Sequence, residues 1–439
     1  MRRTGEFLTY LSVSAGMALA VSCFTVFSLL FQSATTAQIV VALALAGVLC
    51  LGVAGTIAEL AGRFPSSGGL RTYVKAAFGD SASLFVVYMY LGLVLLIAGV
   101  ESYVFAGVVA QFMPEMPRWL TIIVLLGAVI MINVVGMELP GRVQTVLTLS
   151  LLIGLLAIAL FALQFAPPSL PAAPQAERAD WGLLPQLVCL AFFMYVGFEW
   201  VVQVGRDPAA YRRMIPSAML VAIMLLGVTY GLFALALGAH LEPAQIAGTQ
   251  TPQIALGGQL LGDAGRGLLA FMSVLAILTS FNAGLLGATR LMYALSREGH
   301  LPRWCATISP RSGAPVGAVL TLGGAAMVSA ILIDRYQAYG AAAALSAVIV
   351  CVSYVSLLAA AWRLKSRELH AGGTPGQNRI PAVVQVMIAL VLTGVAAATA
   401  LSTPSLAAQC AGLVAIAGGL TWGSLAHAKK ARCLRQSTI

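Results

Sequence analysis

The stretch YVGFEW, residues 195–200, lies inside an apolar run long enough to cross a lipid bilayer. Gly197 lowers the free-energy cost of leaving helical geometry, and a charged residue inside a membrane span, here Glu199, is costly and points to function. A helix broken at membrane depth leaves backbone N–H and C=O groups unpaired, which is tolerated only where they line a cavity. The stretch therefore favours a discontinuous helix beside a binding site. The alternative is a glycine used only for close helix packing.

The composition of the whole chain is that of a polytopic membrane protein. Of its 439 residues, 60% are hydrophobic and 9% are charged, whereas a soluble domain is about half apolar and about a quarter charged. A soluble enzyme with a large core is therefore excluded. The seven cysteines form no close-spaced pair in the sequence, so we expect neither a zinc site nor a disulfide framework.

Twelve segments are long and apolar enough to cross a bilayer, which takes about 20 residues in a helix. They are 7–32, 37–60, 80–110, 118–136, 144–165, 182–203, 215–239, 266–296, 315–334, 338–362, 381–402 and 405–426. The first is interpreted as an uncleaved span rather than a signal peptide, because its apolar run continues to Phe31. Residues 1–439 are thus expected to form a single transmembrane domain. Within the connection 240–265 we expect a short helix over the outer mouth.

The basic residues indicate the orientation. If the N-terminus is cytoplasmic, 21 of the 25 Lys and Arg residues fall on the cytoplasmic side. The other four are Arg118, Arg178, Arg266 and Arg335. This asymmetry predicts a plasma or inner membrane protein with both termini in the cytoplasm. It also accounts for the net charge of +10 without a nucleic-acid partner.

Three acidic residues fall within the predicted spans. Glu59 lies near the end of its span, within reach of Arg63, which indicates an interfacial ion pair. Glu101 and Glu199 lie deeper. Each is either a satisfied structural carboxylate or a group that handles substrate or protons.

Discontinuous helices in transporters usually occur as a pair, in corresponding positions of two inverted repeats. If 182–203 opens the second repeat, its partner is 7–32, where SVSAGMALAVSC permits a break between Ser14 and Ala18. The repeats then cover about 7–165 and 182–362, and 381–426 adds two helices. Because the sequence contains no phosphate-binding P-loop pattern, any transport is expected to be secondary.

Three blocks carry a family resemblance. They are AELAGRFPSSGGLRTYVKAAFG (58–79), FFMYVGFEWVVQVGRDPAAYRRMIPSAML (192–220) and LLGATRLMYALSREGHLPRWCATISPRSGAPV (285–316). In this order they resemble the amino acid–polyamine–organocation transporters, and bacterial amino acid permeases in particular. The resemblance implies an all-α fold of twelve transmembrane helices: a five-plus-five inverted repeat of the leucine-transporter type plus two additional helices. It also implies an amino acid or a related amine as substrate.

The resemblance implies a substrate site at the two breaks. Backbone N–H groups of the first span would bind a carboxylate, and carbonyls of the sixth span would bind an ammonium. The substrate-binding residues predicted in this way are Ser14, Ala15, Gly16, Met17, Phe193, Met194, Tyr195, Val196 and Gly197. Phe193 is expected to close over the substrate, and Glu199 to take part in gating.

Two departures from the family pattern bear on coupling and recognition. The first span has only Gly16 where the family usually has Gly-x-Gly, and Leu151 stands where many sodium-independent members have a lysine. Thr279 and Ser280 are candidate sodium ligands, with bonds to their own helix backbone as the alternative. Coupling to protons and coupling to sodium both remain open. No cofactor and no resident metal are expected.

The sequence thus predicts a transporter of a neutral, fairly apolar amino acid, with a pocket between the first, third, sixth, eighth and tenth spans. Tyr103 is a further candidate for its wall. A cationic amine or polyamine is the first alternative, because Glu101 and Glu199 have no opposing lysine or arginine within the spans. The second is a sensor or partner subunit with the same fold but no transport. Besides the substrate and the lipid bilayer, no partner is predicted, and the oligomeric state is open.

Overall fold

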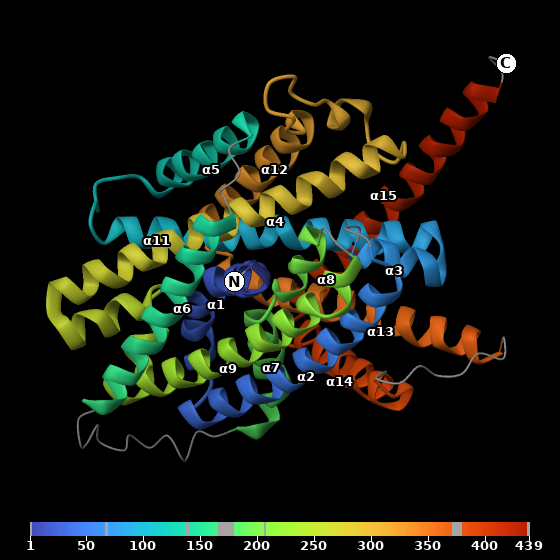
Figure 1. Ribbon diagram of the computed structural model, residues 1–439. Coiled ribbons are helices and arrows are strands. Elements are labelled where there is room, and N and C mark those ends of the chain that lie inside the picture. Colours follow the sequence, from blue (N-terminus) through green and yellow to red (C-terminus); the bar gives the residue numbers. More distant parts are fainter. Residues whose placement is uncertain are drawn as a thin grey trace.

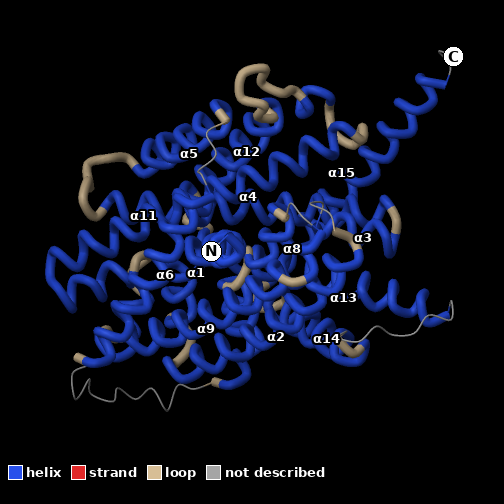
Figure 2. Tube along the Cα trace, viewed as in Figure 1, coloured by secondary structure: helices blue, strands red, loops and turns tan. Residues whose placement is uncertain are grey.

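A computed structural model describes residues 2–65, 69–136, 141–165, 180–205, 208–370 and 380–436. Over these ranges the chain forms helices and connecting loops without strands (Figures 1 and 2). Eleven helices are long and apolar enough to cross a membrane, and α1 (Arg2–Phe31) is a further helix of 30 residues. The predicted all-α fold of twelve membrane-spanning helices is confirmed.

The long helices follow one another with short connections. They are α1, α2 (Thr36–Arg63), α4 (Asp80–Ala110), α5 (Arg118–Val135), α6 (Gly141–Gln164), α7 (Leu184–Met194) with the 3-10 helix η3 (Phe198–Val204), α9 (Met214–His240), α11 (Pro252–Arg297), α12 (Val316–Arg335), α13 (Tyr339–His370), α14 (Ala382–Ala400) and α15 (Pro404–Gln436). Short helices lie in the connections. They are α3 (Gly69–Phe78), η2 (Trp181–Leu183), α8 (Pro208–Arg212), α10 (Pro243–Ala247) and η4 (Arg303–Ala306).

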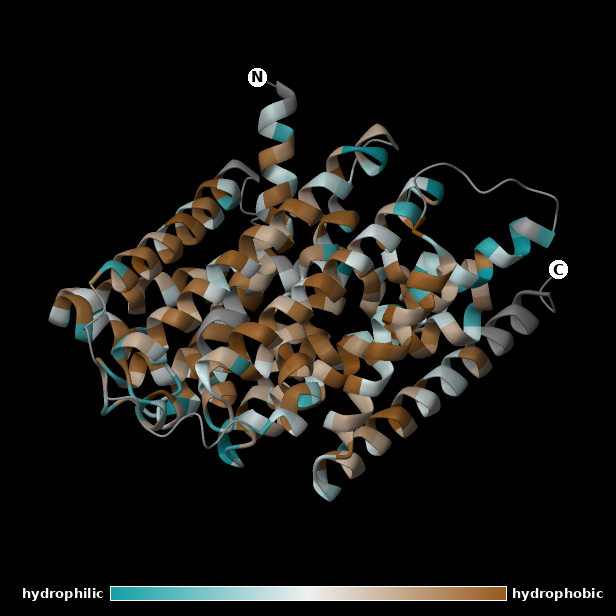
Figure 3. Ribbon diagram, turned by 90° about the horizontal axis from the view of Figure 1, so that it is seen from below, coloured by the Kyte–Doolittle hydropathy of each residue, from teal (hydrophilic) through white to brown (hydrophobic). Residues whose placement is uncertain are grey.

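The helices differ in how much of their apolar surface the protein itself covers. In the most apolar stretch of α13, 72% of the residues are buried, whereas in that of α15 only 17% are buried. On α15, Ile416 and Trp422 are 62% and 77% exposed, and in Figure 1 this helix extends away from the bundle. Hydrophobic residues are spread along the helices, while hydrophilic residues gather toward the loops and helix ends (Figure 3). Exposed apolar helix surfaces of this kind are suited to contact with lipid.

α1 occupies the centre of the bundle (Figure 1) and packs against α6, α7, α9, α11 and η3. The face at which α1 begins is called the inner face below, because the distribution of Lys and Arg predicts it to be cytoplasmic. With successive spans running in opposite directions, α2 and α11 end at this face.

The connection before the eighth span differs from its prediction. It contains α10 and also the first part of α11, which reverses at Gly262 with φ +59°. The helical arms before and after Gly262 pack closely against each other. A Cβ on Gly257 would lie 2.5 Å from the carbonyl oxygen of Gly265. The predicted span 266–296 is the arm that follows Gly262, and the helical arm before it lengthens the outer connection.

Candidate substrate site

The sixth span is broken, as the sequence predicts. α7 ends at Met194, residues 195–197 form a turn, and η3 begins at Phe198. Gly197 has φ +114°, in the left-handed region that favours glycine. A Cβ at this position would also lie 2.4 Å from the Cβ of Met17 on α1. Glycine is therefore required here both by the backbone conformation and by the close approach of α1.

The backbone groups that the break leaves unpaired form hydrogen bonds with nearby side chains. The Gly197 N–H donates to Oε2 of Glu199 over 3.1 Å, and the Ser14 hydroxyl donates to the Phe198 carbonyl oxygen over 2.8 Å. The other carboxylate oxygen of Glu199 accepts a 2.7 Å hydrogen bond from the Tyr90 hydroxyl. The glutamate behind the glycine thus caps the break and joins it to α4.

Tyr195 anchors the break on the side away from the cavity. Its hydroxyl donates to the Leu43 carbonyl oxygen of α2 over 3.0 Å, and its ring meets that of Tyr230 edge to face, with centroids 5.6 Å apart. Tyr230 in turn donates to the Ala18 carbonyl oxygen of α1 over 3.1 Å. Helices α1, α2 and α9 therefore hold the turn in place.

The break that the sequence permits in the first span is absent, because α1 is helical from Arg2 to Phe31. Gly16 packs against α6 instead: a Cβ there would lie 2.7 Å from Oγ1 of Thr148. The alanines beside it are the best helix formers. Gly16 thus serves close packing. The unwound backbone that the family resemblance implied for residues 14–17 as a carboxylate site does not occur in this structure.

A small cavity, with a volume of about 50 Å³, lies beside the break. α1, α4, α5, α7, η3, α11 and α12 enclose it. Five predicted residues line it: Met17, Glu101, Phe193, Val196 and Ser280. The first, third, sixth and eighth spans contribute as expected. The expected tenth span, α13, has no residue among the described lining, and α5 and α12 contribute instead.

One carboxylate, that of Glu101, is paired with a hydroxyl in the lining of this cavity. Glu101 is 2% exposed, and Ser280 Oγ donates to its Oε1 over 2.7 Å. The described lining includes no lysine, arginine or histidine. Thr279, the neighbour of Ser280, donates to the Ala276 carbonyl oxygen of its own helix over 2.9 Å. Of the two predicted sodium ligands, Ser280 therefore faces the cavity, and Thr279 bonds to its helix backbone.

Tyr103 lies away from the cavity, in a cluster at the outer end of α4. Its ring stacks on Tyr339 with centroids 5.4 Å apart, and the guanidinium of Arg118 lies 4.5 Å from the ring centroid. Arg118 also forms a 2.7 Å ion pair with Asp334. Gln250 donates to the Tyr103 hydroxyl, which ties the connection before α11 to this cluster.

The remaining predicted residues surround the cavity without lining it. They are Ser14, Ala15, Gly16, Met194, Tyr195, Gly197 and Glu199. All of them except the partly buried Glu199 have buried side chains or, for the glycines, close contacts with neighbouring helices. They form the packed layer that fixes the shape of the break.

Sequence reasoning missed Tyr90 and Trp200, both of which line the cavity. Their rings lie 5.9 Å apart. Gly287 makes room for the indole, since a Cβ there would lie 2.2 Å from Cζ3 of Trp200. A signal for Tyr90 was present, because it precedes Glu101 by eleven residues, about three helical turns. The two side chains therefore share one face of α4.

A discontinuous helix against a central helix, with a cavity beside the break, is an arrangement typical of secondary transporters. A family profile described as amino acid permease matches residues 6–420. The chain belongs to this family of the amino acid–polyamine–organocation superfamily.

Curated relatives agree with the family. The chain is 23% identical to a gamma-aminobutyric acid permease of Bacillus subtilis over 293 residues, which are 64% of this chain and 62% of that protein. It is 26% identical to L-asparagine permease 1 of Mycobacterium tuberculosis over 306 residues, 64% of this chain and 61% of the relative. The matched part thus spans somewhat under two thirds of these relatives.

Solved structures support the fold. A manganese transporter of Eremococcus coleocola superposes with a TM-score of 0.59 at 14% identity, covering 97% of this chain and 95% of that one. A Na⁺-coupled sialic acid symporter superposes with a TM-score of 0.57 at 12% identity, covering 90% of each chain. Both have the leucine-transporter fold, so the five-plus-five repeat with two further helices is confirmed.

Proposed function

We propose that this permease moves a neutral, fairly apolar amino acid across the membrane by alternating access. The observation that carries the proposal is the Glu101–Ser280 pair in a largely apolar cavity, whose described lining contains no basic residue. A buried carboxylate without a cationic partner is costly. An ammonium group of a bound substrate offsets that cost, while the apolar walls accept a hydrocarbon side chain. Two relatives are named for amino-acid substrates, which supports an amino acid.

One observation favours a second candidate, a cationic amine without a carboxylate. The unbroken α1 presents helical N–H groups that already bond within the helix, so a substrate carboxylate has no evident partner there. Glu101 alone suffices to bind an amine. The amino acid and its decarboxylated amine are therefore the two compounds to compare.

The test is the thermal stability of the purified full-length chain with leucine, phenylalanine, gamma-aminobutyric acid, asparagine, isoamylamine and phenethylamine, each with and without sodium and at two pH values. A ligand that binds only the folded state stabilises it by about 2.7 kcal/mol at a hundred times its Kd. We expect a shift with leucine or phenylalanine. Glu101→Gln removes it, and Glu115→Gln, at an exposed site on the outer connection, keeps it.

The other outcomes separate the candidates. A shift with the amines alone, lost in Glu101→Gln, replaces the amino acid by the cationic amine. A shift that persists in Glu101→Gln contradicts the assigned role of this carboxylate. No shift with any compound contradicts both candidates and favours the non-transporting subunit.

A further inference from the structure

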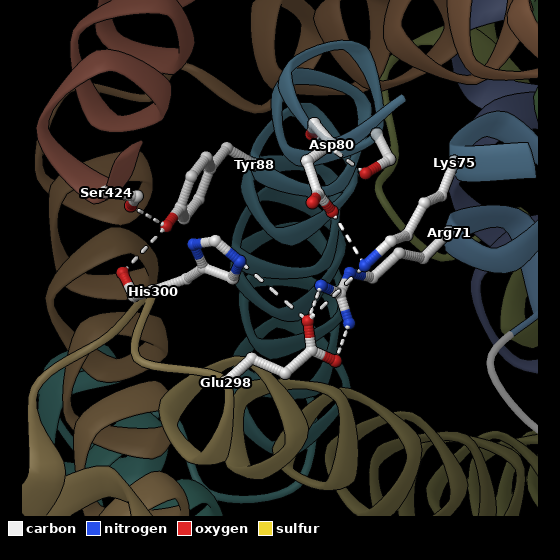
Figure 4. A network of polar contacts seen from close by, with 8 residues as sticks. Arg71, Lys75, Asp80, Tyr88, Glu298, His300 and Ser424 are labelled. Carbon is white, nitrogen blue, oxygen red and sulfur yellow. Dashed lines mark hydrogen bonds and ion pairs between the residues drawn. The ribbon is translucent and has the colours of Figure 1, made fainter. Parts of the chain in front are cut away.

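A polar network on the inner face joins three stretches that are far apart in the sequence, residues 71–88, residues 298–300 and Ser424 (Figure 4). Both terminal nitrogens of Arg71, on α3, donate to the carboxylate of Glu298, which follows α11. Lys75 forms a 2.8 Å ion pair with Asp80 at the start of α4. The connection after α11 is thereby fastened to α3.

His300 lies inside this network. Its side chain is 4% exposed, and its Nε2 is 3.8 Å from Oε2 of Glu298. Its Nδ1 is buried as well. The hydroxyl of Tyr88, on α4, donates to the His300 carbonyl oxygen over 3.4 Å and shares a hydrogen bond with Ser424 of α15. The imidazole is thus enclosed by α3, α4, the connection after α11, and α15.

The position of α3 makes it a cover for the inner end of the site. One face of this helix is buried, through Tyr73, Val74 and Ala77, and the helix packs against α4, α13 and η3. α3 follows α2 at the inner face and contacts η3, which carries Glu199 and Trp200. Access from the inner face requires α3 to separate from its neighbours. That separation parts Arg71 from Glu298 and exposes His300.

We propose that His300 is a proton-binding site that releases α3 when the inner face becomes acidic. In the closed arrangement a second proton on the buried imidazole adds positive charge next to Arg71, and the backbone of Ser424 offsets only part of that cost. Once α3 has separated, water solvates the charged ring. Protons therefore bind more tightly to the released arrangement, and proton binding shifts the population toward it.

Burial and the surrounding charged groups determine the direction in which the pKa of His300 shifts. Burial lowers the pKa of His300 and Arg71 lowers it further, and these effects outweigh Glu298, Asp80 and a backbone hydrogen bond with Ser424, which raise it. Lys75, 4.0 Å from Glu298, adds a second cation from α3. Hydrogen bonds from Arg71 lower the pKa of Glu298, so this carboxylate stays charged. Tyr88 and Ser424 are the described neighbours from α4 and α15.

The lowered pKa of His300 determines how the stability of the closed arrangement depends on pH. The released histidine has the ordinary pKa of about 6.5, and the closed one has a lower pKa. The closed arrangement is therefore fully favoured above about pH 6.5, and this preference is lost as the pH falls below that value. The proposal rests on the proposed function only in treating α3 as the cover of a transport site.

Hydrogen–deuterium exchange of the full chain in lipid nanodiscs, without substrate, tests the proposal. The readout is the exchange rate of residues 69–78, corrected for the intrinsic pH dependence and compared with α14, at pH values of about 7.5, 6.5 and 5.5. We expect the corrected rate to rise as the pH falls. His300→Gln and His300→Asn should abolish the rise, and His370→Gln, at the exposed inner end of α13, should keep it.

A flat rate in the unsubstituted chain overturns the proposal even if neither His300 variant folds. A rise that persists in a folded His300 variant overturns it as well. Because no substrate is present, failure of the thermal-stability panel leaves this result unaffected. The two proposals can therefore fail separately.

Discussion

At the scale of single residues, Gly197 combines two requirements that no other residue meets. Its φ of +114° costs a residue with a Cβ about 1–2 kcal/mol, and that Cβ would lie 2.4 Å from the Cβ of Met17. We expect Gly197→Ala to lower the unfolding temperature and to abolish the ligand-induced thermal shift. Gly127→Ala is the matched control, because its Cβ meets open space on α5 and alanine favours a helix. Wild-type stability and ligand response in Gly197→Ala would contradict this account.

Tyr90 is one of the two cavity residues that the sequence analysis missed. Its hydroxyl donates to Glu199 over 2.7 Å, and a hydrogen bond to a charged group contributes about 1.5–3 kcal/mol. We expect Tyr90→Phe to lower the free energy of unfolding within that range and to weaken ligand binding. Thermal unfolding with and without ligand measures both. Tyr336→Phe, at a side chain 73% exposed, should change neither. Equal effects of the two substitutions would exclude a specific role for the Tyr90 hydroxyl.

At the scale of helices, the packing of α1 on α6 explains why the first span stays helical. A Cβ on Gly16 would lie 2.7 Å from Oγ1 of Thr148, and overpacking of this kind costs about 1–3 kcal/mol. We expect Gly16→Ala to destabilise the protein and Thr148→Ala to relieve most of that loss. A double-mutant cycle on unfolding free energies measures the coupling. Additive effects would show that Gly16 serves something other than this contact.

The two predicted breaks, of which only the one in the sixth span occurs, show which parts of the site could be predicted from the sequence. Gly197 with Glu199 in an apolar run is a local signal, and the break is present. The small residues around Gly16 suit both unwinding and close packing. The choice between them depends on Thr148, more than a hundred residues away, which no local pattern reports. The sequence predicts Tyr103 in the pocket wall because it predicts that the third span contributes to the pocket, but it does not show how far along the helix the cavity extends.

At the scale of the whole molecule, hydrophobicity and charge were enough to predict the membrane-spanning helices and the connections between them. The length of the apolar segments predicts the twelve spans. The positive-inside rule of membrane insertion accounts for the arginine-rich connections. Which helices enclose the cavity depends on how the repeats pack. This is why α5 and α12 were missed and α13 was expected. The structure also places a polar cluster at each face: Arg71 with Glu298 at the inner face, and Tyr103 with Gln250 at the outer.

These two clusters should act in opposite directions on access to the cavity. Arg71→Ala removes contacts that hold α3 closed and should favour opening at the inner face. Gln250→Ala frees the connection before α11 and should favour opening at the outer face, because a destabilised closed arrangement shifts the population toward the open one. The readout is labelling of Ala326→Cys, a small substitution in the cavity wall. A membrane-impermeant maleimide is added to vesicles of either orientation, with the chain lacking Ala326→Cys as background. Faster labelling from opposite sides in the two variants is expected. Faster labelling from the same side in both would mean that the clusters stabilise the fold as a whole and do not control access at separate faces.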